Sequence, residues 1–363
     1  MNFLSKKVNP PVNIKNNRDI FFDALRGIAI TAVVAIHTID SSFLWKHPDI
    51  ENRDFLGIIV YRQLFLFAVP MFLFISGYWL SQKNIRTLND YKNFLTKRLT
   101  RILVPYLFWS VLFLGYSVLR THNLDLKQII YKLLTGGAAI PYYFIILLAQ
   151  LYVLTPVLQY IIRKSYGLSL ILLFNIATLF ALYSSNIFGT IGYLPAFKPF
   201  YSWVIFYAIG LWIGYRKDKT YFSRKIKYLI FSAIFFSLLI SEVETIYLLT
   251  KYPGQLFSAY ALKYSSFVYS ACVILGLLAI RDQVTYWPNF LVVIGRYSFG
   301  IFLIHMPVIM IVATIIQKIG NFSSYQVLYQ PAVASISLFI CCIFIAFIQK
   351  LLPKSFCKKI LGF

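Results

Sequence analysis

Residues 18–40 read RDIFFDALRGIAITAVVAIHTID, and this stretch decides the fold of the chain. It is apolar enough to enter a bilayer, yet it carries Asp23, Arg26 and His37. Each of these side chains is expensive in hydrocarbon, so each needs a partner, a water-filled cavity or a function. Arg26 and His37 are eleven positions apart, about three helical turns, so they share a helix face roughly 16 Å apart along the axis.

Long apolar runs recur through the rest of the sequence. Of 363 residues, 59% are hydrophobic and 13% are charged, whereas a soluble domain has about 25% charged residues. The runs approach the ~20 residues needed to cross a bilayer, and the first has no small-residue cleavage site of a signal peptide. They predict an all-α, polytopic membrane helical bundle with about ten transmembrane helices. The expected spans are 20–40, 56–81, 100–119, 142–162, 167–184, 200–215, 227–249, 258–280, 291–317 and 327–349.

The basic residues predict the orientation. In a soluble protein, a net charge of +23 would suggest a nucleic-acid partner, but here Lys and Arg lie in short loops between the spans. On the side of the N-terminus there are 23 of them, against nine on the other side. The positive-inside rule therefore predicts a plasma-membrane protein with both termini in the cytoplasm. We expect a cytoplasmic tail over 1–19, a single transmembrane domain over 20–350 and a basic cytoplasmic tail over 351–363, with no nucleic-acid partner.

The four cysteines and four histidines show no metal-ligand or disulfide spacing. We expect neither a structural disulfide framework nor a metal site. The oligomeric state stays open.

His37 is the first candidate for chemistry. A pKa near 6.5 suits an imidazole for proton abstraction near neutral pH, and Asp40, three positions on, is spaced to orient the ring or to stabilise its protonated form. The alternatives are a histidine that bonds a neighbouring helix and an acid that faces water at a helix end. Arg26 is either functional or a cytoplasmic anchor that extends to the lipid headgroups, and Gly27 beside it allows another helix to approach closely.

Two later segments also carry polar residues. In KRLTRILVPY, Arg98 and Arg101 share a helix face at the cytoplasmic mouth, where they suit either phosphate or lipid headgroups. In IGRYSFGIFLIHMP, His305 reaches a depth similar to that of His37, which suggests one shared polar cavity. Alternatively, His305 bonds the backbone that Pro307 frees. In VPMFLFISGYWL, the small Ser76 and Gly77 suggest tight helix packing.

These segments resemble the acyltransferase 3 family of integral membrane proteins. FDALRGIAITAVVAIHT is similar to its opening signature, VPMFLFISGY to its second-span motif, KRLTRILVPY to its Arg-x-x-Arg loop and IGRYSFGIFLIHMP to its late histidine helix. Four motifs in the expected order cover most of the chain, in the stand-alone form without a fused extracellular domain. The resemblance implies transfer of an acyl group, most often acetyl from acetyl-CoA, to a hydroxyl of a saccharide at the outer face of the membrane.

The resemblance also implies roles for the residues. Arg98 and Arg101 would hold the phosphates of acyl-CoA, and His37 would serve with Arg26 and Asp40 as general base or as transient acyl carrier. The developing oxyanion needs a donor, which would be His305, Tyr297 or a backbone amide near Gly77. Succinyl transfer would use the same chemistry. The rival class is a transporter of a polysaccharide or lipid-linked sugar that uses the buried His, Arg and Asp as a relay.

Overall fold

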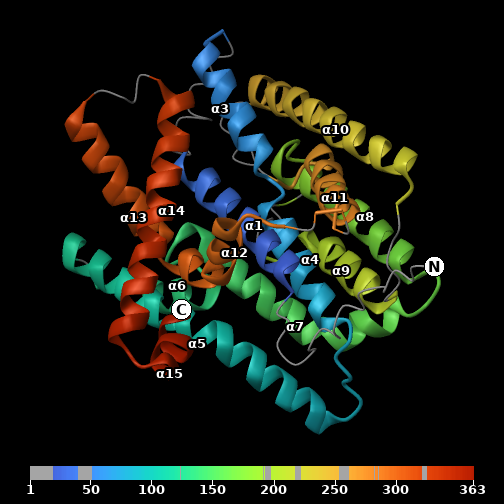
Figure 1. Ribbon diagram of the computed structural model, residues 1–363, viewed down its shortest axis with the longest axis horizontal. Coiled ribbons are helices and arrows are strands. Elements are labelled where there is room, and N and C mark those ends of the chain that lie inside the picture. The colour runs from blue at the N-terminus through green and yellow to red at the C-terminus, as the bar shows by residue number, and fades with distance from the viewer. Residues whose placement is uncertain are drawn as a thin grey trace, which may run out of the picture.

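The computed structural model describes residues 19–39, 51–122, 124–190, 192, 198–216, 222–252, 261–281, 283–284, 286–320 and 325–363. Regular structure within these ranges is entirely helical (Figure 1). The main helices are α1 (Ile20–Thr38), α3 (Arg53–Leu64), α4 (Ala68–Leu80), α5 (Leu88–Thr121), α6 (Leu126–Thr135), α7 (Tyr143–Ile162), α8 (Gly167–Asn186), α9 (Val204–Arg216), α10 (Arg224–Lys251), α11 (Tyr264–Ala279), α12 (Asn289–Arg296), α13 (Ser298–Ile319) and α14 (Gln326–Leu351).

The helices confirm the predicted membrane fold. Eight helical segments are long and apolar enough to cross a bilayer, and the segment of α3 and α4 counts as one of them. The shorter apolar helices α9 and α11 occupy two further predicted spans. The chain is therefore a multi-pass membrane protein, and each of the ten predicted spans contains helix.

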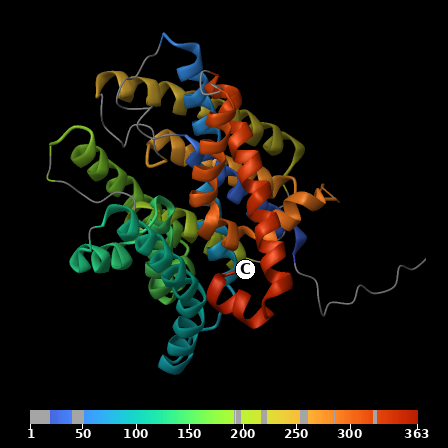
Figure 2. The same ribbon diagram turned by 90° about the vertical axis from the view of Figure 1, so that its left-hand side faces the viewer.

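Helix α1 lies in the middle of the bundle, with other helices around it in both views (Figures 1 and 2). It packs against α4, α12, α13 and α14. Its membrane-spanning window is 67% buried, against 22% for α10 and 28% for α14. The polar residues of α1 thus lie inside the protein, while the apolar outer faces of α10 and α14 suit contact with lipid.

Glycines lie at two close helix crossings. At the crossing of α1 and α12, a β-carbon on Gly27 would come within 2.1 Å of the Leu291 carbonyl oxygen, and one on Gly295 within 1.7 Å of the Asp23 carbonyl oxygen. At the crossing of α4 and α9, a β-carbon on Gly77 would come within 2.1 Å of the Tyr207 carbonyl oxygen, and one on Gly210 within 2.1 Å of the Phe74 carbonyl oxygen. The close approaches predicted at Gly27 and Gly77 are confirmed, and they bring Asp23 next to the end of α12.

The structure differs from the predicted spans and loops at three places. The second span breaks between α3 and α4, where Pro70 lacks the N–H that would continue the helix back to residue 66. The ninth breaks at Tyr297, between α12 and α13. The expected loop 120–141 contains α6, which the Asp125 side chain caps at the start and Gly136 ends in the left-handed conformation.

The C-terminal segment folds back on the bundle. A short helical stretch over Lys354–Leu361 packs against α5, where the Trp109 indole N–H donates to the Leu361 carbonyl at 3.1 Å. The Phe363 ring lies 6.0 Å from the ring of Trp109. The last residues therefore fix the position of α5, the helix that carries Arg98 and Arg101.

Candidate active site

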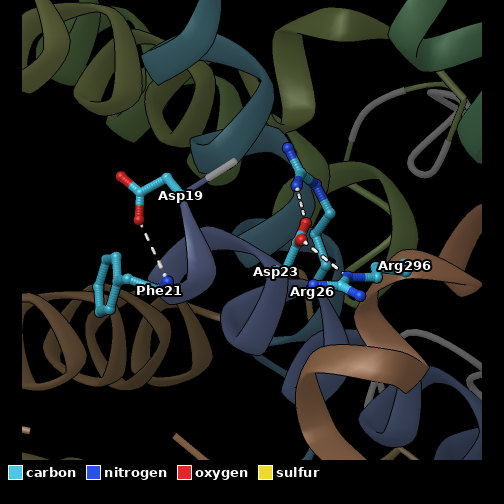
Figure 3. A network of polar contacts seen from close by, with 5 residues as sticks. All are labelled: Asp19, Phe21, Asp23, Arg26 and Arg296. Atoms are coloured by element: carbon cyan, nitrogen blue, oxygen red, sulfur yellow. Dashed lines mark hydrogen bonds and ion pairs between the residues drawn. The ribbon is translucent and has the colours of Figure 1, made fainter. Parts of the chain in front are cut away.

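A buried carboxylate organises one end of α1 (Figure 3). The Asp23 side chain has no exposed surface and lies 2.9 Å from Arg26 Nη1 and 3.6 Å from Arg296 Nε. Asp19 caps the start of α1 through the Phe21 N–H and pairs at 2.9 Å with Arg281. A buried charge is tolerated only when it is paired and hydrogen-bonded, so Asp23 holds two guanidinium groups in fixed positions.

These guanidinium groups border a cavity of about 590 Å³. Arg98 and Arg101 of α5 line it together with Arg26 and Arg296, and we call it the arginine cavity. Lys83 and Asp19 add charge, while Tyr152 and Trp79 give it aromatic surface. Its size lies within the range of about 300–1,000 Å³ that small-molecule and cofactor sites occupy. Planar guanidinium forks bind phosphate oxygens two at a time, so the cavity suits an anionic ligand with several phosphates.

The other end of α1 contributes to a smaller space. His37, Arg62 and Val69 line a pocket of about 70 Å³, which we call the histidine pocket. Arg62 lies in the last turn of α3, with Nη1 3.5 Å from the carbonyl oxygen of Ile36, the residue before His37. Ile140, on the rim of the pocket, is 61% exposed. The pocket thus combines an imidazole, a nearly buried guanidinium group and an exposed edge.

His305 lies directly behind His37. The two rings are 5.4 Å apart between centroids, and His305 is fully buried. Its Nδ1 lies 2.9 Å from the Phe302 carbonyl oxygen and 3.1 Å from that of Ile301. Carbonyl oxygens only accept hydrogen bonds, so Nδ1 carries a proton and a neutral ring keeps its lone pair on Nε2. Among the described residues, that nitrogen has no hydrogen-bond partner.

The sequence predicts that His37 and His305 lie at a similar depth in the membrane, and the structure places their rings side by side. The carbonyl that Pro307 leaves without its helical donor, that of Leu303, accepts the Tyr142 hydroxyl at 2.7 Å, so His305 is not needed for it. Arg26 shares a cavity with Arg98 and Arg101 instead of approaching His37.

Two other predicted site residues do not join the histidines. Tyr297 lies at the junction of α12 and α13 and lines neither the arginine cavity nor the histidine pocket. Asp40 lies outside the described residues. Within the described ranges, no three His, Cys, Asp or Glu side chains are placed to hold a metal ion.

Sequence reasoning passed over Arg62 and the buried polar cluster behind it. Lys263 is fully buried, and its ammonium group donates to Gln63 at 3.0 Å and to Thr245. Ser241 donates to the same amide oxygen at 2.9 Å, which ties α10 to the end of α3. The signal was present in the sequence: a charge within an apolar span, the same signal that identified Arg26.

Comparison with known proteins identifies the family. A family model described as an acyltransferase domain, that of acyltransferase 3, matches residues 19–348. The chain belongs to the acyltransferase 3 family. Membership implies acyltransferase activity and confirms the resemblance on which the sequence motifs depend.

The relatives of this acyltransferase 3 member are distant. The chain is 23% identical over 302 residues to a Staphylococcus aureus protein named "Probable poly-beta-1,6-N-acetyl-D-glucosamine export protein", over 79% of the chain and 81% of that protein. It is 33% identical over 97 residues to the nodulation protein NolL of Sinorhizobium fredii, over 27% of the chain and 25% of that protein. No solved structure matches the chain.

Proposed function

We propose that this protein transfers a short acyl group, acetyl in the first place, from cytoplasmic acyl-CoA to a hydroxyl of a cell-surface or lipid-linked saccharide. The observation that carries the proposal is that the arginine cavity ends against the pocket that contains His37. One end suits recognition of a polyphosphorylated donor, and the other suits proton transfer at its reactive end.

In the donor site, Arg98 and Arg101 make the first contacts with phosphate. Asp23 already pairs with Arg26 and Arg296, but each guanidinium has five N–H donors, so the two retain donors for a ligand. The long thioester arm of the donor then runs along the cavity toward His37. Succinyl-CoA would present the same phosphates and the same thioester.

At the reactive end, His37 takes the proton of the acceptor hydroxyl. The acceptor oxygen then forms a bond to the acyl carbonyl carbon, the carbon–sulfur bond breaks, and the CoA thiolate takes the proton back from His37. Arg62, in the same pocket, would stabilise the oxyanion as it develops, and the Nε2 lone pair of His305 supports a positive charge on His37. Asp40 is proposed for the same supporting role. In the alternative route, His37 itself carries the acyl group between donor and acceptor.

The orientation is also a proposal. The excess of Lys and Arg on one side of the predicted spans supports cytoplasmic termini and a cytoplasmic mouth for the arginine cavity. The acceptor would then reach the histidine pocket from the outer face. The name of the Staphylococcus aureus relative refers to a polymer of N-acetyl-glucosamine, which supports a saccharide as the acceptor class.

Export of a saccharide is the second candidate function, because the name of the same relative describes an export protein. The family argues against it, because the family model that matches residues 19–348 describes an acyltransferase domain.

The deciding experiment supplies radiolabelled acetyl-CoA to the purified protein in vesicles with cell-envelope glycans. Label on the glycan, or on the protein as an intermediate, is the expected result. Glycan movement across the vesicle membrane without any acyl donor, and without label transfer, would establish the exporter instead.

A further inference from the structure

Three phenylalanines separate the arginine cavity from the histidine pocket. Phe72 of α4, Phe144 of α7 and Phe302 of α13 line both spaces. The Phe144 ring lies 6.0 Å from the ring of Phe72 and 5.7 Å from that of Phe302. Rings at these separations are in the normal range of aromatic contact, so the three form one continuous wall.

The wall is tied to the histidines. The Phe302 ring lies 6.1 Å from the ring of His305, and its carbonyl oxygen is one of the two that hold Nδ1 of that residue. On its other side, Phe302 stacks on Tyr142, whose hydroxyl donates to the neighbouring Leu303 carbonyl. Movement of Phe302 would therefore disturb the histidine that supports His37.

The two sides of the wall differ in size and polarity. The arginine cavity is about 590 Å³ and strongly basic, whereas the histidine pocket is about 70 Å³. The smaller space favours a short acyl group over a chain of several more carbons. The wall is also apolar, so it impedes the passage of water and ions between the two ends.

We propose that Phe72, Phe144 and Phe302 form a septum that closes the path between the two compartments when no donor is bound, and that admits only short acyl groups to His37 when a donor occupies the arginine cavity. The closure follows from the shared wall alone. The selectivity rests on the proposed function, because it requires an acyl donor in the arginine cavity.

Closure is tested without any assay of activity. Ser76 and Val69 lie on α4 on opposite sides of Phe72, with Ser76 in the arginine cavity and Val69 in the histidine pocket. In a background without the four natural cysteines, Ser76→Cys and Val69→Cys are exposed to a membrane-impermeant thiol reagent from either face, in right-side-out and inverted vesicles. We expect each cysteine to react from one face only, and the two from opposite faces.

Phe144→Ala should make Ser76→Cys reactive from both faces. Phe299→Ala is the matched control, because Phe299 lines the arginine cavity but not the histidine pocket; there, labelling should stay one-sided. A thermal unfolding transition in detergent close to that of the parent shows that a variant is folded, and Phe72→Ala replaces Phe144→Ala if the latter is not. Two-sided labelling of the parent, or one-sided labelling of folded septum variants, would overturn the proposal.

Selectivity is tested with acetyl-, butyryl- and hexanoyl-CoA. The parent should prefer acetyl, and Phe144→Ala should reduce the preference over hexanoyl by about tenfold or more, the scale on which pocket size discriminates methylenes. Phe180→Ala, on the exposed face of α8, should leave the preference unchanged. If Phe144→Ala is labelled from both faces but keeps the parent's preference for acetyl-CoA over hexanoyl-CoA, the septum closes the path but does not select the acyl group. Absence of transfer from every donor in the parent would reject the proposed function and leave the labelling result standing.

Discussion

The arginine cavity and the histidine pocket use the same helices for opposite purposes. Helix α1 contributes Arg26 to the first and His37 to the second, and α4 and α7 also line both. The arginine cavity is large and charged, and an ion-pair network borders it. The histidine pocket is small, and the His37 that lines it packs against His305. Strong binding of a charged molecule and a controlled proton transfer need different surroundings, and under the proposed function the two ends of α1 would provide them.

The largest expected effect comes from removing the imidazole of His37, which distinguishes the role of the histidine pocket from that of the arginine cavity. His37→Ala should lower acyl transfer by about 10²–10⁴-fold, the contribution of a positioned acid–base group, while acetyl-CoA still binds the arginine cavity. Turnover by purified protein and donor binding by calorimetry measure the two effects. His122→Asn is the control, because His122 lies in the left-handed region at the end of α5, away from both spaces, where Asn is tolerated. Wild-type turnover in His37→Ala would reject the catalytic role.

The next largest effect concerns the carboxylate that holds the arginines. Asp23→Ala removes the buried counter-ion of Arg26 and Arg296, whose side chains are partly exposed, so we expect a loss of about 1.5–3 kcal/mol in the free energy of unfolding, the scale of a charge-assisted hydrogen bond. Asp19→Asn is the matched control: it keeps the cap of α1 and removes only a partly exposed pair, worth about 0–1 kcal/mol. Thermal unfolding in detergent should rank the two variants in this order. Equal losses would show that Asp23 has no special structural role.

A smaller change tests the geometry of the donor site. Arg98→Lys and Arg101→Lys keep the charge but remove the fork, so the KM for acetyl-CoA should rise by the equivalent of about 1.5–3 kcal/mol for each charge-assisted contact. The KM for the acceptor should stay unchanged, since the acceptor is proposed to enter the histidine pocket instead. Lys97→Gln removes a neighbouring exposed charge that does not line the cavity and serves as control. An unaltered donor KM in the double variant would assign both arginines to lipid headgroups.

The last test uses single-cysteine substitutions that should leave activity unchanged. It reports which side of the membrane the histidine pocket and the two termini face. Single cysteines at Lys6 and Lys358 should resist an impermeant reagent added outside intact cells, while one at Ile140, on the rim of the histidine pocket, should react. The prediction depends on the loop charges. External reaction at either terminal position would mean that the orientation or the span count is wrong.

The periodic and compositional parts of the fold were predictable from the sequence. Apolar runs of spanning length located helix in all ten predicted spans, and the small Gly27 and Gly77 marked close crossings. The breaks at Phe65–Phe67 and at Tyr297 were missed, although Pro70 is a recognisable local cause of the first. Helix α6 was missed although Asp125 and Gly136 are recognisable cap residues.

The site was predictable where one strong local signal existed. His37 and His305 could be paired by their similar predicted depth in the membrane, since polar residues in apolar helices usually pair inside the bundle. The second partner of Asp23 could be found only in the structure, because Arg296 is remote in sequence. The septum left no trace in the sequence: the chain has 34 phenylalanines, and nothing in their pattern marks the three that meet.

The ion pairs at the start of α1 have a consequence for biosynthesis. Asp23 has a local partner in Arg26 as soon as the first helix enters the membrane, but Asp19 and Arg281 are 262 positions apart. The arginine cavity therefore forms only after the ribosome has made most of the chain and the late helices have docked on the earliest one. A truncated or stalled product would leave the first helix in the membrane without a complete arginine cavity, so assembly itself limits ligand binding in this cavity to finished protein.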